Sequence, residues 1–140
     1  MPGEVFIKEA SKRTPGVMIR PGKVFIMGRS IPDNPAEFYE PVLEMLSGYD
    51  REPAGRTRID LGFEYINTSS TKWILFILRR LTEMKNLSRD VCVNWYYEHG
   101  DEDMNELGKM LQSFMECPFL ISEVTKMNQD FYTSIRSLEQ

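Results

Sequence analysis

The sequence predicts a single α/β domain, in which an N-terminal β-hairpin precedes helices and strands that alternate in a mixed sheet, with the helices packed on the sheet. Two observations carry this prediction. Short apolar runs with a period of two, typical of strands, alternate along the chain with runs whose apolar residues recur at helical spacing. The 140 residues are 41% hydrophobic and 27% charged, which suits one soluble domain with a substantial core.

The first segments are short and prone to form strands. Residues 4–9 fit a short strand or an ordered arm. Two further β-prone runs, at 17–19 and 24–28, are separated by the turn signal Pro21-Gly22. This arrangement predicts an antiparallel hairpin.

A first helix is predicted to begin at residue 35. Asn34 is suited to cap it, Pro35 to take its first position and Glu37 to take the acidic position of a capping box. Pro41 lies inside the helical pattern and removes a backbone hydrogen bond, so we expect a kink there, or a short first turn followed by a second helical piece. A polar loop is expected over residues 50–56. The apolar face of the helix comprises Phe38, Val42, Met45, Leu46 and Tyr49.

The central feature of the sequence is a strand that runs directly into a helix through four consecutive hydroxyl residues. The apolar positions of the strand alternate with polar ones and are Ile59, Leu61, Phe63 and Tyr65. The hydroxyl residues are Thr68, Ser69, Ser70 and Thr71. The helix is predicted to end at Asn86-Leu87-Ser88, and its apolar residues are Trp73, Ile74, Ile77, Leu78 and Leu81.

The second half of the chain continues the alternation. Residues 91–97 predict a strand, Asp101 is suited to cap a helix, and Pro118 ends that helix before a last strand at 119–121. After Thr125, an apolar pattern predicts a short amphipathic helix or a tail that orders only against a partner. We therefore expect one domain over residues 1–124 and a C-terminal tail over 125–140. The apolar residues are Met104, Leu107, Leu111 and Met115 in the helix, and Met127, Phe131, Ile135 and Leu138 in the tail.

Charge and composition argue against several classes of function. A net charge of −4 argues against nucleic acid as the main partner, because phosphate binding needs a basic surface. The apolar run over residues 73–78 is far shorter than the ~20 residues of a membrane span. The first residues show no secretory signal, so we expect a cytoplasmic protein in which Cys92 and Cys117 are reduced thiols.

The sequence offers little for catalysis, so we expect a protein that is not an enzyme and holds no cofactor. His99, the single histidine, is predicted to be a solvated loop residue. One histidine and two widely spaced cysteines do not supply the four ligands of a structural zinc site. No glycine-rich phosphate loop is present. Four acidic residues near the third helix are better explained by the dipole of that helix than by Mg²⁺ or Ca²⁺: Glu98, Asp101, Glu102 and Asp103.

The hydroxyl junction has two interpretations. A helix start carries unpaired N–H groups and partial positive charge, and Ser, Thr and Asn commonly cap it. One cap is enough, however, and no Asp or Glu lies between Asn67 and Arg80. A phosphate on one of the hydroxyls would therefore meet free N–H groups, with Lys72 one turn away. The residues alone leave open both a capping turn and a phosphoacceptor site.

Several motifs resemble the SiaC family of bacterial regulatory phosphoproteins, once catalogued as a domain of unknown function. The resemblance extends from about Ile7 to Ile121. Its motifs are Thr14-Pro15, Gly28-Arg29-Ser30-Ile31-Pro32-Asp33-Asn34-Pro35 with Glu37-Phe38-Tyr39, Tyr65-Ile66-Asn67-Thr68-Ser69-Ser70-Thr71-Lys72, Val93-Asn94-Trp95-Tyr96-Tyr97-Glu98, Glu102-Asp103-Met104 and Pro118-Phe119.

The resemblance implies a STAS-like fold and a phosphoacceptor threonine, which is Thr68 in this sequence. The implied partners are a kinase similar to anti-sigma-factor kinases, a PP2C-like phosphatase, and a diguanylate cyclase that the unphosphorylated protein activates to make cyclic-di-GMP, a signal for biofilm formation and aggregation. Asn67, Ser69, Ser70 and Lys72 would support the site. Tyr65, Ile66 and Trp73 are candidates for the partner surface.

Two alternatives come from other classes of protein. The first is a small module that binds a nucleotide or a phosphorylated metabolite, with the helix N-terminus at Ser69 and Ser70 as a permanent anion site. The second is a scaffold that dimerises through Phe131, Ile135 and Leu138 of the tail. For the regulatory protein we expect a monomer or a weak dimer.

Overall fold

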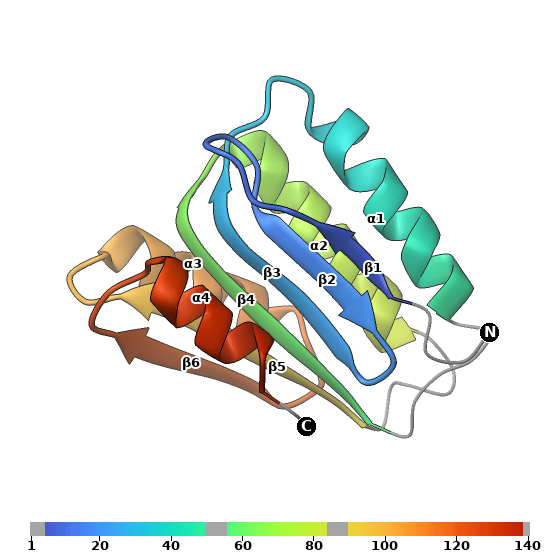
Figure 1. The fold of residues 1–140 in the computed structure, drawn as a ribbon. Helices are drawn as coiled ribbons and strands as arrows, with labels where there is room; N and C mark the ends of the chain where they lie inside the picture. Colours follow the sequence, from blue (N-terminus) through green and yellow to red (C-terminus); the bar gives the residue numbers. More distant parts are fainter. Residues whose placement is uncertain (1–4, 50–55, 84–89, 139–140) are drawn as a thin grey trace.

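A computed structural model describes residues 5–49, 56–83 and 90–138 as a six-stranded sheet with four helices (Figure 1). The strands lie in the sheet in chain order. They are β1 (Phe6–Lys8), β2 (Gly16–Arg20), β3 (Lys23–Ser30), β4 (Thr57–Ile66), β5 (Val91–Glu98) and β6 (Phe119–Val124). The helices are α1 (Pro35–Tyr49), α2 (Thr68–Glu83), α3 (Glu102–Ser113) and α4 (Gln129–Arg136).

The sheet is mixed, as predicted. β1, β2 and β3 pair antiparallel, and the β2–β3 hairpin turns at Gly22, whose φ of 87° suits glycine. β3, β4, β5 and β6 pair parallel through the crossover helices α1, α2 and α3. The prediction of an α/β domain with a hairpin followed by alternating helices and strands is therefore confirmed.

The two faces of the sheet carry separate apolar clusters. The main core joins β2 to β6 with α1, α2 and α3, and its largest fully buried side chain is Trp95 on β5. Gly108 of α3 lies directly against that indole, since a Cβ at position 108 would be 2.5 Å from Trp95 Cδ1. This close approach fixes α3 on the sheet, and Trp95 Nε1 donates a hydrogen bond to the Met104 carbonyl at 2.9 Å.

Helix α1 is one continuous element. Asn34 caps it as predicted, with Oδ1 accepting a hydrogen bond from the Glu37 N–H at 3.3 Å. The helix continues through Pro41, so the expectation of two helical pieces is wrong. Val42 and Leu46, which follow the proline, are fully buried. Their packing offsets the ~3 kcal/mol that a proline inside a helix costs.

The segment after Thr125 forms α4, which lies across the opposite face of the sheet (Figure 1). Asn128 caps α4, and Tyr132 and Ile135 are buried. They pack with Met127 against an apolar patch of β2 and β3 that consists of Met18, Phe25 and Met27. The segment thus orders against its own sheet, and the buried Ile135 is not available as a dimer contact.

A charged network lies between α4 and the sheet. Lys23 and Asp60 are fully buried, with Lys23 Nζ 3.8 Å from Asp60 Oδ2. Lys23 also donates to the carbonyls of Ile135 and Leu138 at the end of α4. Arg58 Nε donates to both oxygens of Asp60 at 2.9 and 3.0 Å. The buried carboxylate is therefore paired with two cations, one of which also holds α4.

Two further expectations lie outside the described residues. The predicted polar loop falls almost entirely on residues 50–55, and the predicted end of α2 falls on residues 84–89.

Candidate functional site

The candidate site lies where β4 passes into α2. The carboxyl ends of the parallel strands share one edge of the sheet, the edge at which ligand and partner sites commonly form in α/β folds. A single residue, Asn67, connects Ile66 at the end of β4 to Thr68 at the start of α2. The Asn67 N–H donates to the Ser30 carbonyl at 3.0 Å, which fixes the junction to the end of β3.

Asn67 is the residue that caps α2. Its Oδ1 accepts a hydrogen bond from the Ser70 N–H at 2.9 Å, and its carbonyl accepts from the Thr71 N–H at 3.1 Å. This is the geometry of an asparagine N-cap. Because Asn67 supplies the cap, none of the four hydroxyls is needed for that role.

The fold gives the four hydroxyl residues different environments. Ser70 is fully buried, and Thr71 Oγ1 donates to the Asn67 carbonyl at 3.2 Å. Ser69 is exposed, and its Oγ donates weakly to Asn67 Oδ1 at 3.4 Å. Thr68 is exposed, and its hydroxyl forms no hydrogen bond with any described residue. Of the four, Thr68 is the one that is both accessible and unengaged.

The electrostatics around Thr68 favour an anion. The first turn of α2 contains no acidic residue, and Lys72 is exposed four residues after Thr68, on the same side of the helix. Within the described ranges, the N–H groups of Thr68 and Ser69 have no hydrogen-bond acceptor. Free N–H groups at a helix start, together with the helix dipole, stabilise negative charge at this position.

A β-bulge lies directly before the candidate partner residues Tyr65 and Ile66. Gly28 of β3 pairs with Phe63, but the next residue, Arg29, pairs with Tyr65, so Glu64 is inserted. The insertion reverses the alternation of sides, which leaves Tyr65 54% exposed and Ile66 8% exposed. Ile66 packs in the main core, which corrects its expected place on the partner surface.

Trp73 packs against α1, whereas Tyr65 is exposed at the end of β4. Trp73 is half-buried and stacks on Tyr39 with a ring separation of 6.2 Å. Burial raises the pKa of Tyr39 to about 12, and its hydroxyl is 2.6 Å from Ser30 Oγ.

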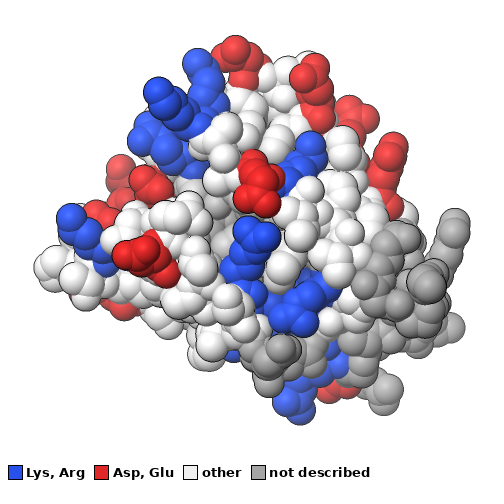
Figure 2. Space-filling model, viewed as in Figure 1, with Lys and Arg blue, Asp and Glu red and all other residues white. Residues whose placement is uncertain are grey.

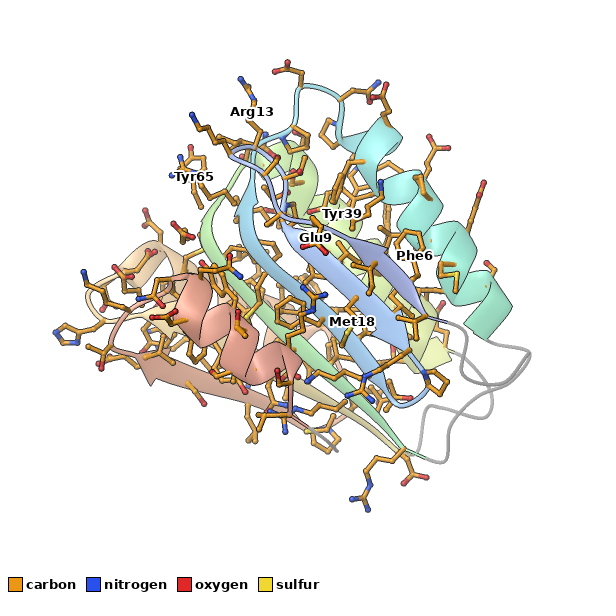
Figure 3. All side chains as sticks on the ribbon, in the orientation of Figure 1. Phe6, Glu9, Arg13, Met18, Tyr39 and Tyr65 are labelled. Carbon is orange, nitrogen blue, oxygen red and sulfur yellow. The ribbon has the colours of Figure 1, made fainter. Side chains whose placement is uncertain are left out.

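Tyr65 points outward at the edge of the molecule where Figure 3 also places Arg13. Lys and Arg side chains gather around this edge in the surface view of Figure 2.

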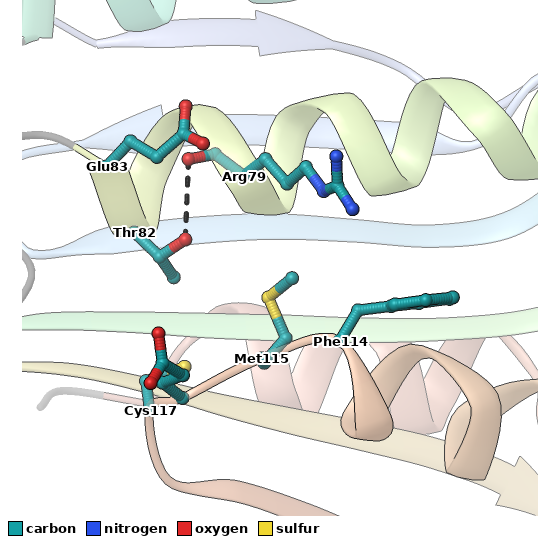
Figure 4. Close-up of a pocket in the computed structure, with 7 residues that line it drawn as sticks. Arg79, Thr82, Glu83, Phe114, Met115 and Cys117 are labelled. Carbon is teal, nitrogen blue, oxygen red and sulfur yellow. Dashed lines mark hydrogen bonds between the residues drawn. The ribbon is translucent and has the colours of Figure 1, made fainter.

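A pocket of about 350 Å³ lies at the far end of α2 (Figure 4). Its lining includes Arg79 and Thr82 of α2, and Phe114 and Cys117 from the segment after α3. Burial raises the pKa of the Cys117 thiol, which disfavours the reactive thiolate. The length of α2 separates this pocket from Thr68.

The remaining candidates for chemistry lie apart from the site. His99 is exposed, as predicted, and its Nδ1 is 2.7 Å from Glu123 Oε2. This contact raises the pKa of His99. In the part of the chain that the structure describes, no group of three or more His, Cys, Asp or Glu side chains is placed to hold a metal ion. No described helix has both the length and the apolar character needed to cross a bilayer.

The alternative of a permanent anion site at Ser69 and Ser70 loses one of its two hydroxyls. The Ser70 side chain is fully buried, and its N–H already donates to Asn67. Ser69 remains accessible, but one exposed hydroxyl and a helix end do not define a pocket for a nucleotide.

The sequence and the fold of this chain match known proteins. An uncharacterized protein of Pseudomonas aeruginosa strain UCBPP-PA14 is 29% identical over 100 residues, which are 71% of this chain and 79% of that protein. The crystal structure of apo-SiaC from Pseudomonas aeruginosa superposes with a TM-score of 0.75 at 25% identity, covering 85% of this chain and 98% of that one.

A second crystal structure contains the diguanylate cyclase SiaD in complex with its activator SiaC, also from Pseudomonas aeruginosa. The match has a TM-score of 0.75 at 25% identity and covers 85% of this chain and 99% of the matched one. The family model of the SiaC family regulatory phosphoproteins matches residues 8–124, which include every element from β2 to β6. This chain belongs to the SiaC family of regulatory phosphoproteins.

Proposed function

We propose that this protein is a signalling regulator that acts by binding partners, without catalysis of its own, and that phosphorylation of Thr68 switches it. The observation that carries the proposal is the state of the hydroxyls at the start of α2. Asn67 caps the helix, Ser70 is buried, and Thr68 is exposed and unengaged. A kinase can reach Thr68 without opening the fold.

The helix start would stabilise the modified residue. A phosphothreonine carries nearly two negative charges at neutral pH and three strong acceptor oxygens. The N–H groups of Thr68 and Ser69 have no acceptor among the described residues, and Lys72 is one turn away. These groups can bind the phosphate while Asn67 retains the cap. The same charge would face any protein docked over this end of α2.

Family membership supports the choice of partners. SiaC of Pseudomonas aeruginosa is the activator of the diguanylate cyclase SiaD. We propose that the unphosphorylated form of this chain likewise binds and activates a diguanylate cyclase in the cytoplasm, and so controls cyclic-di-GMP and biofilm formation. A kinase similar to anti-sigma-factor kinases and a PP2C-like phosphatase would set the level of Thr68 phosphorylation.

The acceptor is tested by intact mass after co-expression with the kinase from the same genome. Wild type and Ser69→Ala, the matched control, are expected to gain the mass of one phosphate, and Thr68→Ala to gain none. Full labelling of Thr68→Ala would show that Thr68 is not the acceptor.

The direction of the switch is tested by cyclase activity in the presence of each variant. Thr68→Ala is expected to activate the enzyme as wild type does, because the substitution removes an exposed side chain whose hydroxyl is unengaged. The phosphorylated protein is expected to lose activation, since the added charge opposes docking. Activation that increases on phosphorylation would reverse the proposed direction.

A further inference from the structure

Strand β4 loses one of its two neighbours before it reaches Thr68. β5 is in register with β4 from Thr57 to Gly62, whereas β4 continues to Ile66. Beyond Gly62, β4 pairs with β3 alone, and the described sheet contains no residue in register with Glu64 on either side. The end of β4, which leads into the phosphoacceptor junction, is therefore held by fewer backbone pairs than the rest of the strand. Its position depends more on side-chain contacts.

The segment that follows β6 packs where β4 and β5 separate. Met127 lies beside Gly62, since a Cβ at position 62 would be 2.7 Å from Met127 Cε. The Met127 N–H donates to Glu98 Oε1 at 2.8 Å. The Phe131 ring of α4 packs edge-on against Tyr96, the last residue of β5 in register with β4, with a ring separation of 5.3 Å. These contacts place α4 next to the end of β4 that has only one neighbouring strand.

Tyr132 of α4 bonds directly to the bulge. Its hydroxyl donates a hydrogen bond to Glu64 Oε2 at 2.5 Å. The Tyr132 side chain is buried, and burial, followed by the bond to the Glu64 carboxylate, raises the pKa of Tyr132. The hydroxyl therefore keeps its proton and acts as the donor. Because the acceptor is a carboxylate, this bond is stronger than one between neutral groups, and it holds a residue that the sheet leaves unpaired.

The bulge sets the arrangement of the residues before Thr68. Glu64 lies four residues before Thr68, and Tyr65, which follows it, is 54% exposed because the insertion reverses the alternation of sides. A kinase bound over Thr68 also meets this end of β4. Without the Tyr132 bond, the bulge gains local freedom, and residues 65–68 spend less time in a single arrangement.

We propose that Tyr132 is a positioning residue for the Thr68 switch, because its hydrogen bond to Glu64 holds residues 65–68 in the arrangement that the kinase binds. The proposal rests on the proposed function and adds a control to it. That control comes from outside the part of the chain that matches the family, since the match ends at residue 124 and α4 begins at Gln129.

The test measures the kinetics of Thr68 phosphorylation by the kinase from the same genome, with the full-length protein as the varied substrate and ATP saturating. Tyr132→Phe retains the ring and removes only the hydroxyl. It is expected to raise KM by about 3- to 30-fold, the range of coupling between linked positions. The kcat should stay within about twofold of wild type, because the kinase binds the same arrangement when it is less populated. If the wild type is not phosphorylated at Thr68, the proposed function itself fails.

The matched control removes a different tyrosine–glutamate contact. Tyr97→Phe deletes a hydroxyl that donates to Glu123 Oε1 at 3.4 Å between β5 and β6, and its KM is expected to stay within about twofold of wild type. In a Glu64→Ala background, Tyr132→Phe should have no further effect, since both changes remove the same bond. Glu64→Gln, which keeps an oxygen acceptor, should have a lower KM than Glu64→Ala.

Hydrogen exchange separates positioning from a general loss of stability. In Tyr132→Phe, exchange at the amides of residues 65–68 is expected to quicken while exchange in the buried part of α2 stays unchanged. Quickening throughout the molecule would overturn the positioning role, as would an equal rise in KM in the Glu64→Ala background. If Tyr132→Phe is phosphorylated at Thr68 with the KM of wild type, the role of Tyr132 is overturned and the proposed function stands.

Discussion

Phosphorylation of Thr68 should stabilise the folded protein, and the size of the effect follows from the start of α2. An anion at a helix N-terminus contributes about 0.3–1 kcal/mol at an exposed site and up to ~2 kcal/mol in favourable geometry. The pair with Lys72, four residues along, adds about 0.2–0.5 kcal/mol. Because Asn67 already caps the helix, no existing hydrogen bond of Thr68 is lost. The expected gain is about 1–2 kcal/mol.

The gain is measured by urea and thermal unfolding of phosphorylated and unphosphorylated protein, with stoichiometry checked by intact mass. For a domain of this size, about 1–2 kcal/mol corresponds to a rise in melting temperature of roughly 3–8 °C. Lys72→Gln should remove about 0.2–0.5 kcal/mol of the gain. Salt at ~1 M should remove part of it, because the screening length falls to about 3 Å.

A melting temperature that is unchanged or lower after phosphorylation would refute this reasoning. It would mean that the phosphate remains in solvent or displaces the Asn67 cap, so that the free N–H groups of Thr68 and Ser69 do not receive it. A gain that persists fully in Lys72→Gln would instead assign the whole effect to the helix N-terminus.

Three other outcomes are expected. Asn67→Ala should lower the free energy of unfolding, measured by urea unfolding, by about 1 kcal/mol, because the helix loses its cap. Ser69→Ala, the matched control, should lower it by less than about 0.5 kcal/mol. Asp60→Asn should lower it by about 3–5 kcal/mol, since Lys23 would be left buried without its carboxylate; a loss below ~1 kcal/mol would contradict the ion pairing. An NMR titration should give His99 a pKa above 6.5 that falls towards 6.5 in Glu123→Gln. The stabilisation from this pair is complete below pH 6.5 and is lost as the pH rises through the folded-state pKa.

Local patterns in the sequence predicted much of the fold. The alternation of apolar periods located β2 to β6 and α1 to α3, while β1 and α4 stood as one of two alternatives each, and the caps at Asn34 and Asp101 are where the side-chain chemistry placed them. These features depend on residues within one turn or one strand. They are predictable because the residues that determine them are neighbours in the chain.

Features that depend on pairing between distant segments were not predictable. The bulge at Glu64 depends on the register of β4 against β3, so a strict alternation wrongly grouped Tyr65 with the buried positions. The buried pair of Lys23 and Asp60 also escaped prediction, because α4 covers it from the end of the chain. A charged residue in an otherwise apolar strand does not reveal which segment will bury it.

The candidate site also combines features that neighbouring residues predict with features that only the folded chain determines. The identity of the capping residue and the burial of Ser70 could be settled only by the structure, because Asn67, Ser69 and Ser70 are all chemically suited to cap a helix. Phe76 was missed as a surface residue, although it follows Thr68 and Lys72 at a constant spacing of four. That spacing could have indicated that Phe76 lies on the same side of the helix as Thr68 and Lys72.

The two sides of α2 together indicate what kind of switch this protein is. Its inner side is fixed by fully buried residues, Ile74, Ile77, Leu78 and Leu81, so a large movement of the helix would cost several kcal/mol of apolar burial. The phosphate offers only about 1–2 kcal/mol at the helix start, and that contribution favours the existing conformation. A modification cannot drive a structural change that costs more than its own differential energy. Phosphorylation of Thr68 should therefore act by changing the charge at one end of a rigid binding surface, with the backbone of α2 the same in both states.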